Sequence, residues 1–270
     1  VRIKPVQFLK EEQKVKKSKH TKSKSKRIII RTMLVIVFLI SIAVLLLHLH
    51  NLNKEKQDNQ NILENIKIDT AEVTEERTEK MIQLEELQKE NEEIIGWLEI
   101  AETNINLPVC QAQDNSYYLT HNYKKEKATS GALFLDKDFN LDKPSTNYLI
   151  YGHRNKNGTM FEDLMKYKDE QFFKSHPTIK FTTTKEDTEY QIIAVFFSRV
   201  YYKDEQNVFR YYQFVNAESE TEYNEYISNC KKASIYDTGA TAEYGEQLLT
   251  LSTCEYSQED GRFAIVAKKK

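Results

Sequence analysis

Two residues close to the C-terminal end of the chain have the types and spacing needed for nucleophilic chemistry. Cys254 ends an apolar segment, residues 247–254, and Arg262 begins the next one, residues 262–267. We expect both segments to be strands, and strands joined by so short a loop pair antiparallel, which places the thiol opposite the guanidinium. A fixed positive charge favours the thiolate, and the thiolate is the nucleophilic form of cysteine. The pattern therefore predicts a catalytic cysteine site.

A catalytic cysteine needs an acid and base partner, and histidine is the usual one. Three of the six histidines lie in or beside an N-terminal segment that we assign below to the cytoplasm and the membrane: His20, His48 and His50. Of the others, His153 is the best placed, because it follows the apolar segment 147–152, which we expect to be a strand. Gly152 in this segment allows another part of the chain to approach its backbone closely, and the end of a strand places the imidazole at the rim of the sheet. We expect His121 and His176 to be solvated or capping residues.

Several motifs occur together between about residue 96 and the C-terminus. They are IGWLEI at 95–100, DN followed by YYL within 114–119, YGHR at 151–154, and TLSTC at 250–254 with Arg262 downstream. Together they resemble the sortase family of cysteine transpeptidases, which has the same order of His, Cys and Arg, and their details resemble class B in particular. Each motif alone would be weak evidence, but their conjunction in this order is specific. The resemblance also implies a mainly antiparallel β-barrel with peripheral helices.

The residue types indicate how such a site would work. A Cys254 thiolate attacks a peptide carbonyl, Arg262 stabilises the resulting oxyanion with its planar guanidinium, and His153 protonates the leaving amine. His153 then deprotonates the amine that resolves the thioester, so the result is a transpeptidation. The sortase resemblance, and not the spacing, implies that the substrate is a surface protein of a Gram-positive cell with a sorting signal of the Asn-Pro-x-Thr type. It likewise implies that the acceptor is a peptidoglycan precursor or another cell-wall amine.

Two other classes of function remain open at this point. A cysteine peptidase would pass the same acyl-enzyme to water. A membrane-anchored binding protein could use a sortase-like barrel without catalysis.

Four further residues are candidates for binding the peptide substrate. Asn115 resembles the substrate-side asparagine of class B enzymes, and Tyr151 shares the strand face of the predicted catalytic histidine by period-two alternation. Ser252 shares the face of the cysteine, and Glu255 could orient the arginine or the peptide. For each of the four residues, an ordinary structural role in its strand or loop is an equal alternative to substrate binding. The aromatic segment 207–212 could form a peptide-binding wall or anchor a helix.

The remaining chemistry-bearing residues have simpler interpretations. Cys110 and Cys230 are expected to be small core residues, although a disulfide between them stays open. Asp136, Asp138 and Asp142 lack the glycine-containing ligand spacing of an EF-hand, so we expect a solvated turn and no metal. No glycine-rich phosphate loop is present, and we expect no cofactor.

The N-terminal part of the chain has a different composition from the rest. Residues 1–52 hold twelve Lys or Arg and two Glu, a net charge of +10, whereas residues 53–270 carry −12. No charged residue occurs from Thr32 to Asn53, and about 20 apolar residues suffice to span a bilayer. Because the basic residues precede this segment, we expect a retained signal anchor with a cytoplasmic N-terminus and an extracellular catalytic domain. No small-residue cleavage site follows the segment, which argues against a cleaved signal peptide.

The expected domain organisation follows from these segments. Residues 1–31 form a basic cytoplasmic tail that contacts membrane lipid, 32–52 a transmembrane anchor, 53–79 a polar stalk and 80–270 the catalytic domain. The basic tail lacks interleaved aromatic residues, so we expect no nucleic-acid partner. The chain begins with Val1, which is compatible with an alternative initiation codon or a truncation.

The domain 80–270 is long enough for one core. A helix is expected from about residue 78 to 93, on the spacing of its apolar residues. Two capping boxes, Thr159 with Glu162 and Ser219 with Glu222, predict helices over 160–168 and 220–232. Eight segments rich in β-branched and aromatic residues predict strands and hence a closed, mainly β, eight-stranded barrel of the sortase type: 94–100, 105–110, 131–136, 147–152, 178–184, 190–200, 247–254 and 262–267.

Overall fold

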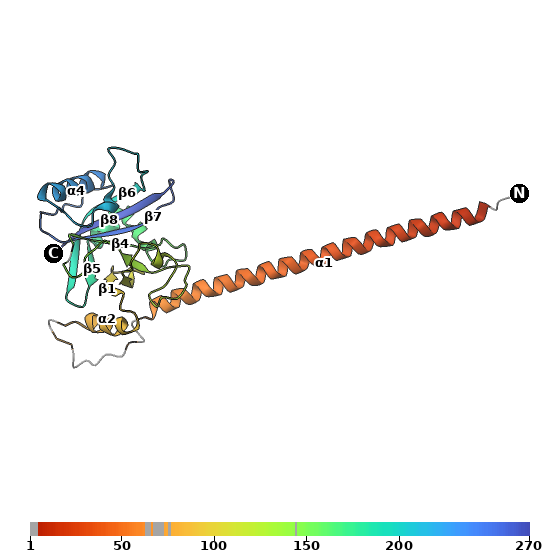
Figure 1. Cartoon of the computed structure of the whole chain (residues 1–270), viewed down its shortest axis with the longest axis horizontal. Helices are drawn as coiled ribbons and strands as arrows, with labels where there is room; N and C mark the ends of the chain where they lie inside the picture. Colours follow the sequence, from red (N-terminus) through yellow and green to blue (C-terminus); the bar gives the residue numbers. More distant parts are fainter. Residues whose placement is uncertain (1–4, 63–65, 67–72, 75–76, 144) are drawn as a thin grey trace. The chain divides into compact units, whose positions relative to one another are not determined.

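The computed structural model describes residues 5–62, 66, 73–74, 77–143 and 145–270, with side chains from Ile30 onward except at residue 60. Internal contacts divide the chain into two units, residues 1–53 and residues 54–270. Most of the predicted stalk, at 63–65, 67–72 and 75–76, lies outside the described residues. The elements carry the labels of Figure 1.

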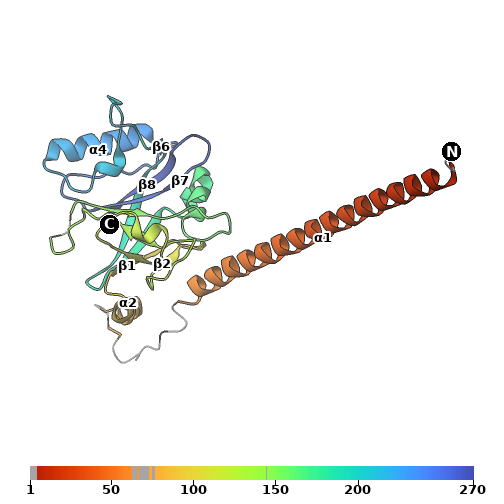
Figure 2. The same ribbon diagram turned by 45° about the vertical axis from the view of Figure 1, so that its right-hand side comes forward.

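One long helix, α1 (Pro5–Gln60), forms the described part of the N-terminal unit and ends within the second unit; it is drawn in red and orange in Figures 1 and 2. Its part Ile30–Asn59 is long and apolar enough to cross a membrane by length and composition. The helix continues through the polar residues 53–60, where a stalk was expected to begin. Lys, Glu and Gln are good helix formers, so a polar composition does not by itself end a helix.

Eight strands within the described residues form a closed barrel in the order β1-β2-β3-β4-β7-β8-β6-β5, which confirms the predicted architecture. The β2/β3 and β4/β7 pairs are parallel and the other described pairs are antiparallel. The strands are β1 (Ile94–Glu99), β2 (Asn106–Cys110), β3 (Leu133–Leu135), β4 (Asn147–Tyr151), β5 (Thr178–Thr182), β6 (Asp187–Arg199), β7 (Leu248–Cys254) and β8 (Gly261–Lys269).

The helices of this unit are peripheral. Thr78 caps α2 (Glu79–Glu90) by accepting a hydrogen bond from the Met81 N–H. Ser219 caps α4 (Glu220–Ala233) in the same way through the Glu222 N–H, as its capping box predicts. The shorter helices are η2 (Tyr117–Leu119), η3 (Glu162–Lys168), α3 (Glu170–Ser175) and η4 (Tyr211–Gln213).

The helix expected to begin at residue 160 starts later than predicted. The first residue of η3 is Glu162, and the Thr159 hydroxyl donates to the Asn157 side chain instead of accepting from the helix. Met160 has φ +55°, which is incompatible with a helical first turn. The capping box at Thr159 was therefore a wrong prediction.

Two hydrophobic cores lie on opposite faces of the sheet. The larger core includes the barrel residues Leu249, Leu251 and Ile265, whereas Leu248, Ala264 and other residues of the opposite face belong to a second core. This second core also contains residues of α4 and of the segment before it. Figure 2 shows α4 lying along β6, β7 and β8 on the outside of the barrel. By alternation, positions 248, 250, 252 and 254 of β7 share the outer face.

Candidate active site

The strand ends that carry the predicted catalytic residues are neighbours in the barrel. β4 pairs in parallel with β7, with Tyr151 opposite Ser252. β7 pairs antiparallel with β8, with Cys254 opposite Arg262. The thiol and the guanidinium therefore start from directly paired backbone positions, as the short hairpin predicts.

The pairing of β4 with β7 continues beyond the last residue of β4. The Gly152 N–H donates to the Ser252 carbonyl oxygen at 3.2 Å, and the Thr253 hydroxyl donates to the Gly152 carbonyl oxygen at 2.8 Å. His153 and Cys254 each lie two residues beyond the Tyr151–Ser252 pair on their own segments, so both follow the paired ends of β4 and β7 at the same edge of the barrel. The three predicted residues thus stand at the ends of three consecutive strands.

A backbone carbonyl holds the imidazole of His153. Its Nε2 atom lies 2.8 Å from the carbonyl oxygen of Leu119. Because a carbonyl oxygen only accepts hydrogen bonds, Nε2 carries a proton, and Nδ1 is the nitrogen left to exchange a proton within the site. Gly131, at φ +63°, lies against both this ring and the backbone before it, since a Cβ there would lie 2.5 Å from the Tyr118 carbonyl oxygen and 3.1 Å from Cδ2 of His153. Residue 131 therefore helps to set the orientation of the histidine.

Arg262 is half-buried, and backbone carbonyls orient its guanidinium. One terminal nitrogen donates to the carbonyl oxygens of Gly261 at 2.9 Å and Asp260 at 3.3 Å. In the described part of the chain, no carboxylate lies within ion-pair distance of this guanidinium. The positive charge beside Cys254 is thus not neutralised by a neighbouring acid.

Glu255 is buried, with 5% of its surface exposed. Its carboxylate accepts hydrogen bonds from the Ser257 N–H at 2.9 Å and from the Ser257 hydroxyl, and it lies 3.7 Å from Lys168 and 4.0 Å from Arg154. Burial acts to raise the pKa of Glu255, but the Ser257 hydrogen bonds and the two cations prevail and hold it below its usual value. These contacts anchor the loop between β7 and β8.

Ser252 is 2% exposed and contacts a residue of the aromatic segment 207–212. Its Oγ lies 2.7 Å from the hydroxyl of Tyr211, which is fully buried in the second core. The sequence is compatible with two roles for the aromatic segment 207–212, a peptide-binding wall and an anchor for a helix. Phe209 packs against Tyr226 of α4, and Tyr211 packs against Phe196 of β6, so Phe209 contacts the helix and Tyr211 contacts the barrel.

Tyr151 and Asn115 contact one common carboxylate, that of Asp136. The Tyr151 hydroxyl donates to Oδ2 of Asp136 at 3.0 Å, and Nδ2 of Asn115 donates to the same atom at 2.9 Å. Asp136 is 4% exposed, so the expectation of a solvated turn was wrong for this residue. Asp138 and Asp142 are exposed, as that expectation requires. Alternation in a three-residue strand is too short a signal to reveal that residue 136 points inward.

Of the other two histidines of the barrel unit, His176 has the capping position that the sequence predicts, and both stack on an aromatic ring, which the sequence did not predict. His121 stacks on Tyr117, with ring centroids 4.2 Å apart. His176 is the C-cap of α3 and stacks on Phe172 at the same distance. Neither contact engages the predicted catalytic residues.

The other two cysteines are free and buried, which closes the disulfide alternative. Burial raises the pKa of Cys110 to about 12, and burial likewise raises the pKa of Cys230. Both sulfurs therefore stay protonated at neutral pH. Cys254 is the cysteine whose side chain is partly exposed.

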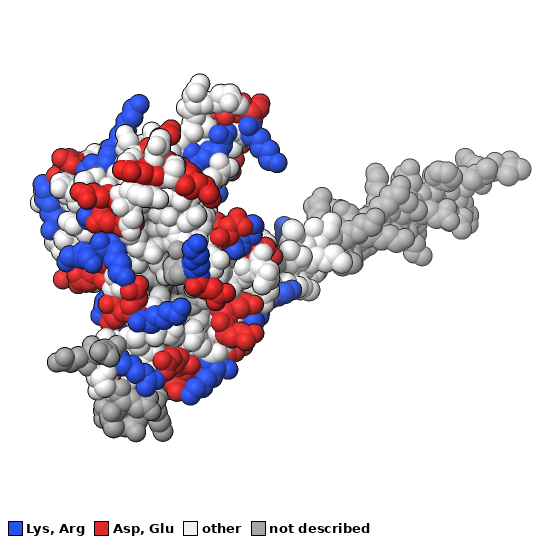
Figure 3. Space-filling model, turned by 60° about the vertical axis from the view of Figure 1, so that its left-hand side comes forward, with Lys and Arg blue, Asp and Glu red and all other residues white. Residues whose placement is uncertain are grey.

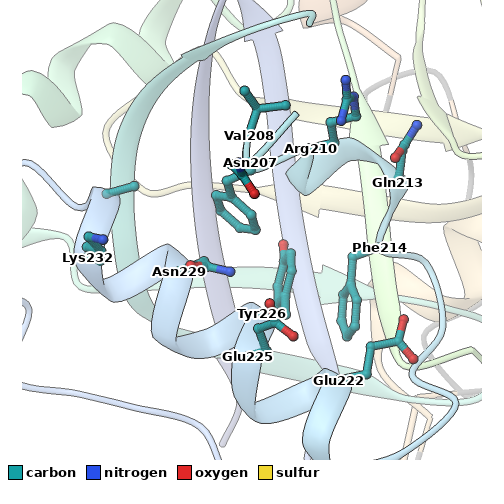
Figure 4. Close-up of a pocket in the computed structure, with 12 residues that line it drawn as sticks. Asn207, Val208, Arg210, Gln213, Phe214, Glu222, Glu225, Tyr226, Asn229 and Lys232 are labelled. Carbon is teal, nitrogen blue, oxygen red and sulfur yellow. The ribbon is translucent and has the colours of Figure 1, made fainter. Parts of the chain in front are cut away.

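A cavity of about 730 Å³ lies between α4 and the segment before it, away from the three strand ends. Figure 4 shows Phe214 and Tyr226 side by side at this cavity, with Glu225, Asn229 and Lys232 projecting from α4. The two rings stack with centroids 3.9 Å apart, so each covers a face of the other.

On the face of the barrel unit seen in Figure 3, Lys and Arg alternate with Asp and Glu, and no single-sign patch dominates.

Comparison with known proteins agrees with this geometry. A model of the sortase domain family matches residues 98–270. Sortase B of Listeria monocytogenes is 36% identical over 215 residues, covering 78% of this chain and 84% of the relative. Sortase B of Staphylococcus aureus is 29% identical over 188 residues, covering 69% and 74%. The crystal structure of Bacillus anthracis sortase B in complex with AAEK1 aligns with a TM-score of 0.68 at 32% identity, covering 82% and 98%.

The chain therefore belongs to the sortase family. Its relatives are class B members of that family of cysteine transpeptidases, and it is a sortase-type enzyme.

Proposed function

We propose that this sortase is a membrane-anchored transpeptidase that cleaves the C-terminal sorting signal of surface proteins and joins them to a cell-wall amine. Its catalytic residues are Cys254, His153 and Arg262. The observation that carries the proposal is the pairing of Cys254 with Arg262 across β7 and β8, beside the end of β4 that His153 follows.

The first step forms a thioester. The sulfur of Cys254 attacks the carbonyl carbon of the threonine in the sorting signal, and the carbonyl oxygen becomes an oxyanion. Arg262 donates hydrogen bonds to this oxyanion, and its charge is not neutralised by an acid in the described part of the chain. The carbon–nitrogen bond then breaks, and the leaving amine takes a proton from His153.

The second step transfers the acyl group. An amine of the cell wall attacks the thioester carbonyl while His153, now neutral, accepts a proton from the attacking nitrogen. The carbon–sulfur bond breaks, Cys254 leaves as a thiolate, and a new amide bond forms. The thiolate and the protonated histidine are restored for the next cycle.

The test uses the full-length chain in detergent with a fluorescence-quenched peptide carrying an Asn-Pro-x-Thr motif, with and without a saturating glycine-peptide amine. We expect a ligated product by mass spectrometry, and an acyl adduct on Cys254 when the amine is omitted. Cys254→Ala removes both, whereas Cys230→Ala at a buried thiol keeps them. If the peptide is hydrolysed to the same extent with and without saturating amine, the protein is a cysteine peptidase instead. Absence of any cleavage that depends on Cys254 supports a binding protein.

The anchoring part of the proposal rests on α1. From Ile30 to Leu49 its large apolar side chains are exposed, as in Leu34 and Phe38. Exposed apolar surface of this extent is stable only in a non-aqueous environment. The basic residues before this segment favour a cytoplasmic N-terminus, which leaves the barrel outside the cell. Protease added outside intact cells should then digest the barrel unit and spare the basic N-terminal tail.

A further inference from the structure

Asp136 is a buried carboxylate close to the site. It directly follows β3, and its side chain accepts three hydrogen bonds. Oδ2 accepts from the Tyr151 hydroxyl and from Nδ2 of Asn115, and Oδ1 accepts from the Asp138 backbone N–H at 2.9 Å. Among the described residues, no cationic side chain lies within ion-pair distance of Asp136.

Burying a carboxylate is unfavourable unless donors satisfy its oxygens. Three neutral donors do so for Asp136, where an apolar side chain would avoid the cost. An ionised carboxylate can only accept hydrogen bonds, so it also fixes the direction of each bond it makes. The arrangement therefore determines which way its partners point their protons.

This matters for Tyr151, because a hydroxyl has one proton to donate. Two acceptors surround it: the Asp136 carboxylate at 3.0 Å and the Tyr212 carbonyl oxygen at 3.5 Å. The nearer and charged acceptor takes the proton. Burial and the negative Asp136 both raise the pKa of Tyr151, so the phenol stays protonated in the working pH range. The lone pairs of its oxygen remain free to accept a hydrogen bond.

Asn115 is held from both ends of its amide. Nδ2 donates to Asp136, and Oδ1 accepts from the Lys137 backbone N–H at 2.8 Å. The two side chains most expected to line the peptide, Asn115 and Tyr151, are thus fixed by one carboxylate. Tyr151 lies two residues before His153, so their side chains leave β4 and its extension on the same face.

We propose that Asp136 is a positioning residue for the sorting-signal peptide. It fixes the Asn115 amide and the Tyr151 hydroxyl as one unit beside the catalytic residues, and it makes the Tyr151 oxygen an acceptor for a peptide N–H. This inference rests on the proposed function.

The test compares Asp136→Asn, Tyr151→Phe and the double variant in the full-length chain. We expect each single change to raise KM for the sorting peptide about tenfold, as for loss of one hydrogen bond to a charged group, with kcat within about twofold of wild type. The double variant should lose no more than Asp136→Asn alone, because Asp136→Asn already disrupts the contact that Tyr151→Phe removes. The rate at which iodoacetamide alkylates Cys254 should not change.

Asp138→Asn is the matched control, because this exposed carboxylate lies two residues away, and it should leave KM unchanged. The inference is overturned if Asp136→Asn leaves KM unchanged, if the two losses multiply, or if alkylation of Cys254 slows in parallel with peptide cleavage.

A second measurement does not depend on turnover. Fluorotyrosine placed at position 151 should shift its ¹⁹F resonance with Asp136→Asn and not with Asp138→Asn. If the wild-type chain cleaves no sorting peptide, the proposed function fails, whereas the resonance still decides whether Asp136 orients Tyr151. An unchanged resonance overturns the inference by itself.

Discussion

At the scale of single residues, Arg262 combines a charge with a geometry that lysine lacks. One of its terminal nitrogens already donates to the carbonyl oxygens of Gly261 and Asp260. The remaining N–H groups of the planar guanidinium are then free to face an oxyanion. The ammonium of lysine has a single nitrogen, so it cannot contact the two backbone carbonyl oxygens with one atom and the oxyanion with another.

Arg262→Lys should therefore lower kcat about a hundredfold, the loss expected when one oxyanion donor is removed, with a smaller effect on KM. Steady-state kinetics with the sorting peptide checks this. Arg77→Lys, a change at a half-buried arginine that pairs with Glu85 on α2, is the control and should retain full activity. Retention of more than half of the wild-type kcat by Arg262→Lys would remove the oxyanion role.

At the scale of elements, the position of His153 depends on close packing just before it. A Cβ at Gly152 would lie 2.5 Å from Cδ2 of Leu133 and 2.7 Å from the Phe161 ring, so the backbone that carries His153 would have to move. Gly152→Ala should lower kcat/KM about a hundredfold, since a shift of about 1 Å has such effects on catalysis.

Gly239→Ala is the matched control for this change. No atom lies within 4 Å of a Cβ at that position, and the only cost is the unfavourable φ of +69°. It should lower the melting temperature slightly and leave kcat/KM unchanged. Equal losses of activity in the two variants would mean that general destabilisation, and not displacement of His153, explains the first result.

The loop between β7 and β8 should be sensitive to acid through Glu255. Its pKa is lowered in the folded chain, so its contribution to stability is complete above the ordinary value of 4.5 and is lost as pH falls through the lower folded value. We expect the free energy of unfolding to fall below about pH 4.5, and to fall less steeply in Glu255→Gln. Denaturant titrations across this pH range measure the slope. The exposed Glu259→Gln in the same loop should keep the wild-type slope.

At the scale of the whole molecule, the chain consists of two units that differ in whether they contain a hydrophobic core. The barrel unit, residues 54–270, contains both hydrophobic cores, all eight strands and the three predicted catalytic residues. The helix of the N-terminal unit has exposed side chains from Ile30 to Asn51. Folding of the barrel should therefore not depend on the N-terminal unit.

A chain that begins at Lys54 should melt within about 3 °C of the full-length chain, a shift of roughly 1 kcal/mol at this size. It should keep its kcat and lose its binding to lipid vesicles. Calorimetry and vesicle sedimentation are the two measurements. A truncated chain that still sediments with vesicles would place the membrane contact in the barrel unit.

The sequence by itself determined the barrel, its eight strands and the candidates His153, Cys254 and Arg262. It could do so because strand signals are local, and because a short hairpin fixes which residues face each other. Local signals also identified α2 from the spacing of its apolar residues, α4 from its capping box, and the apolar part of α1 at 32–52 from its composition.

Only the tertiary structure decided how the side chains around these residues are used. The burial of Asp136, its hold on Tyr151 and Asn115, and the bond between Tyr211 and Ser252 join segments 15 to 41 residues apart. The contacts of Glu255 with Arg154 and Lys168 are likewise long-range. The direction of a polar side chain depends on which partners the fold brings within hydrogen-bonding distance, and no local pattern contains that information.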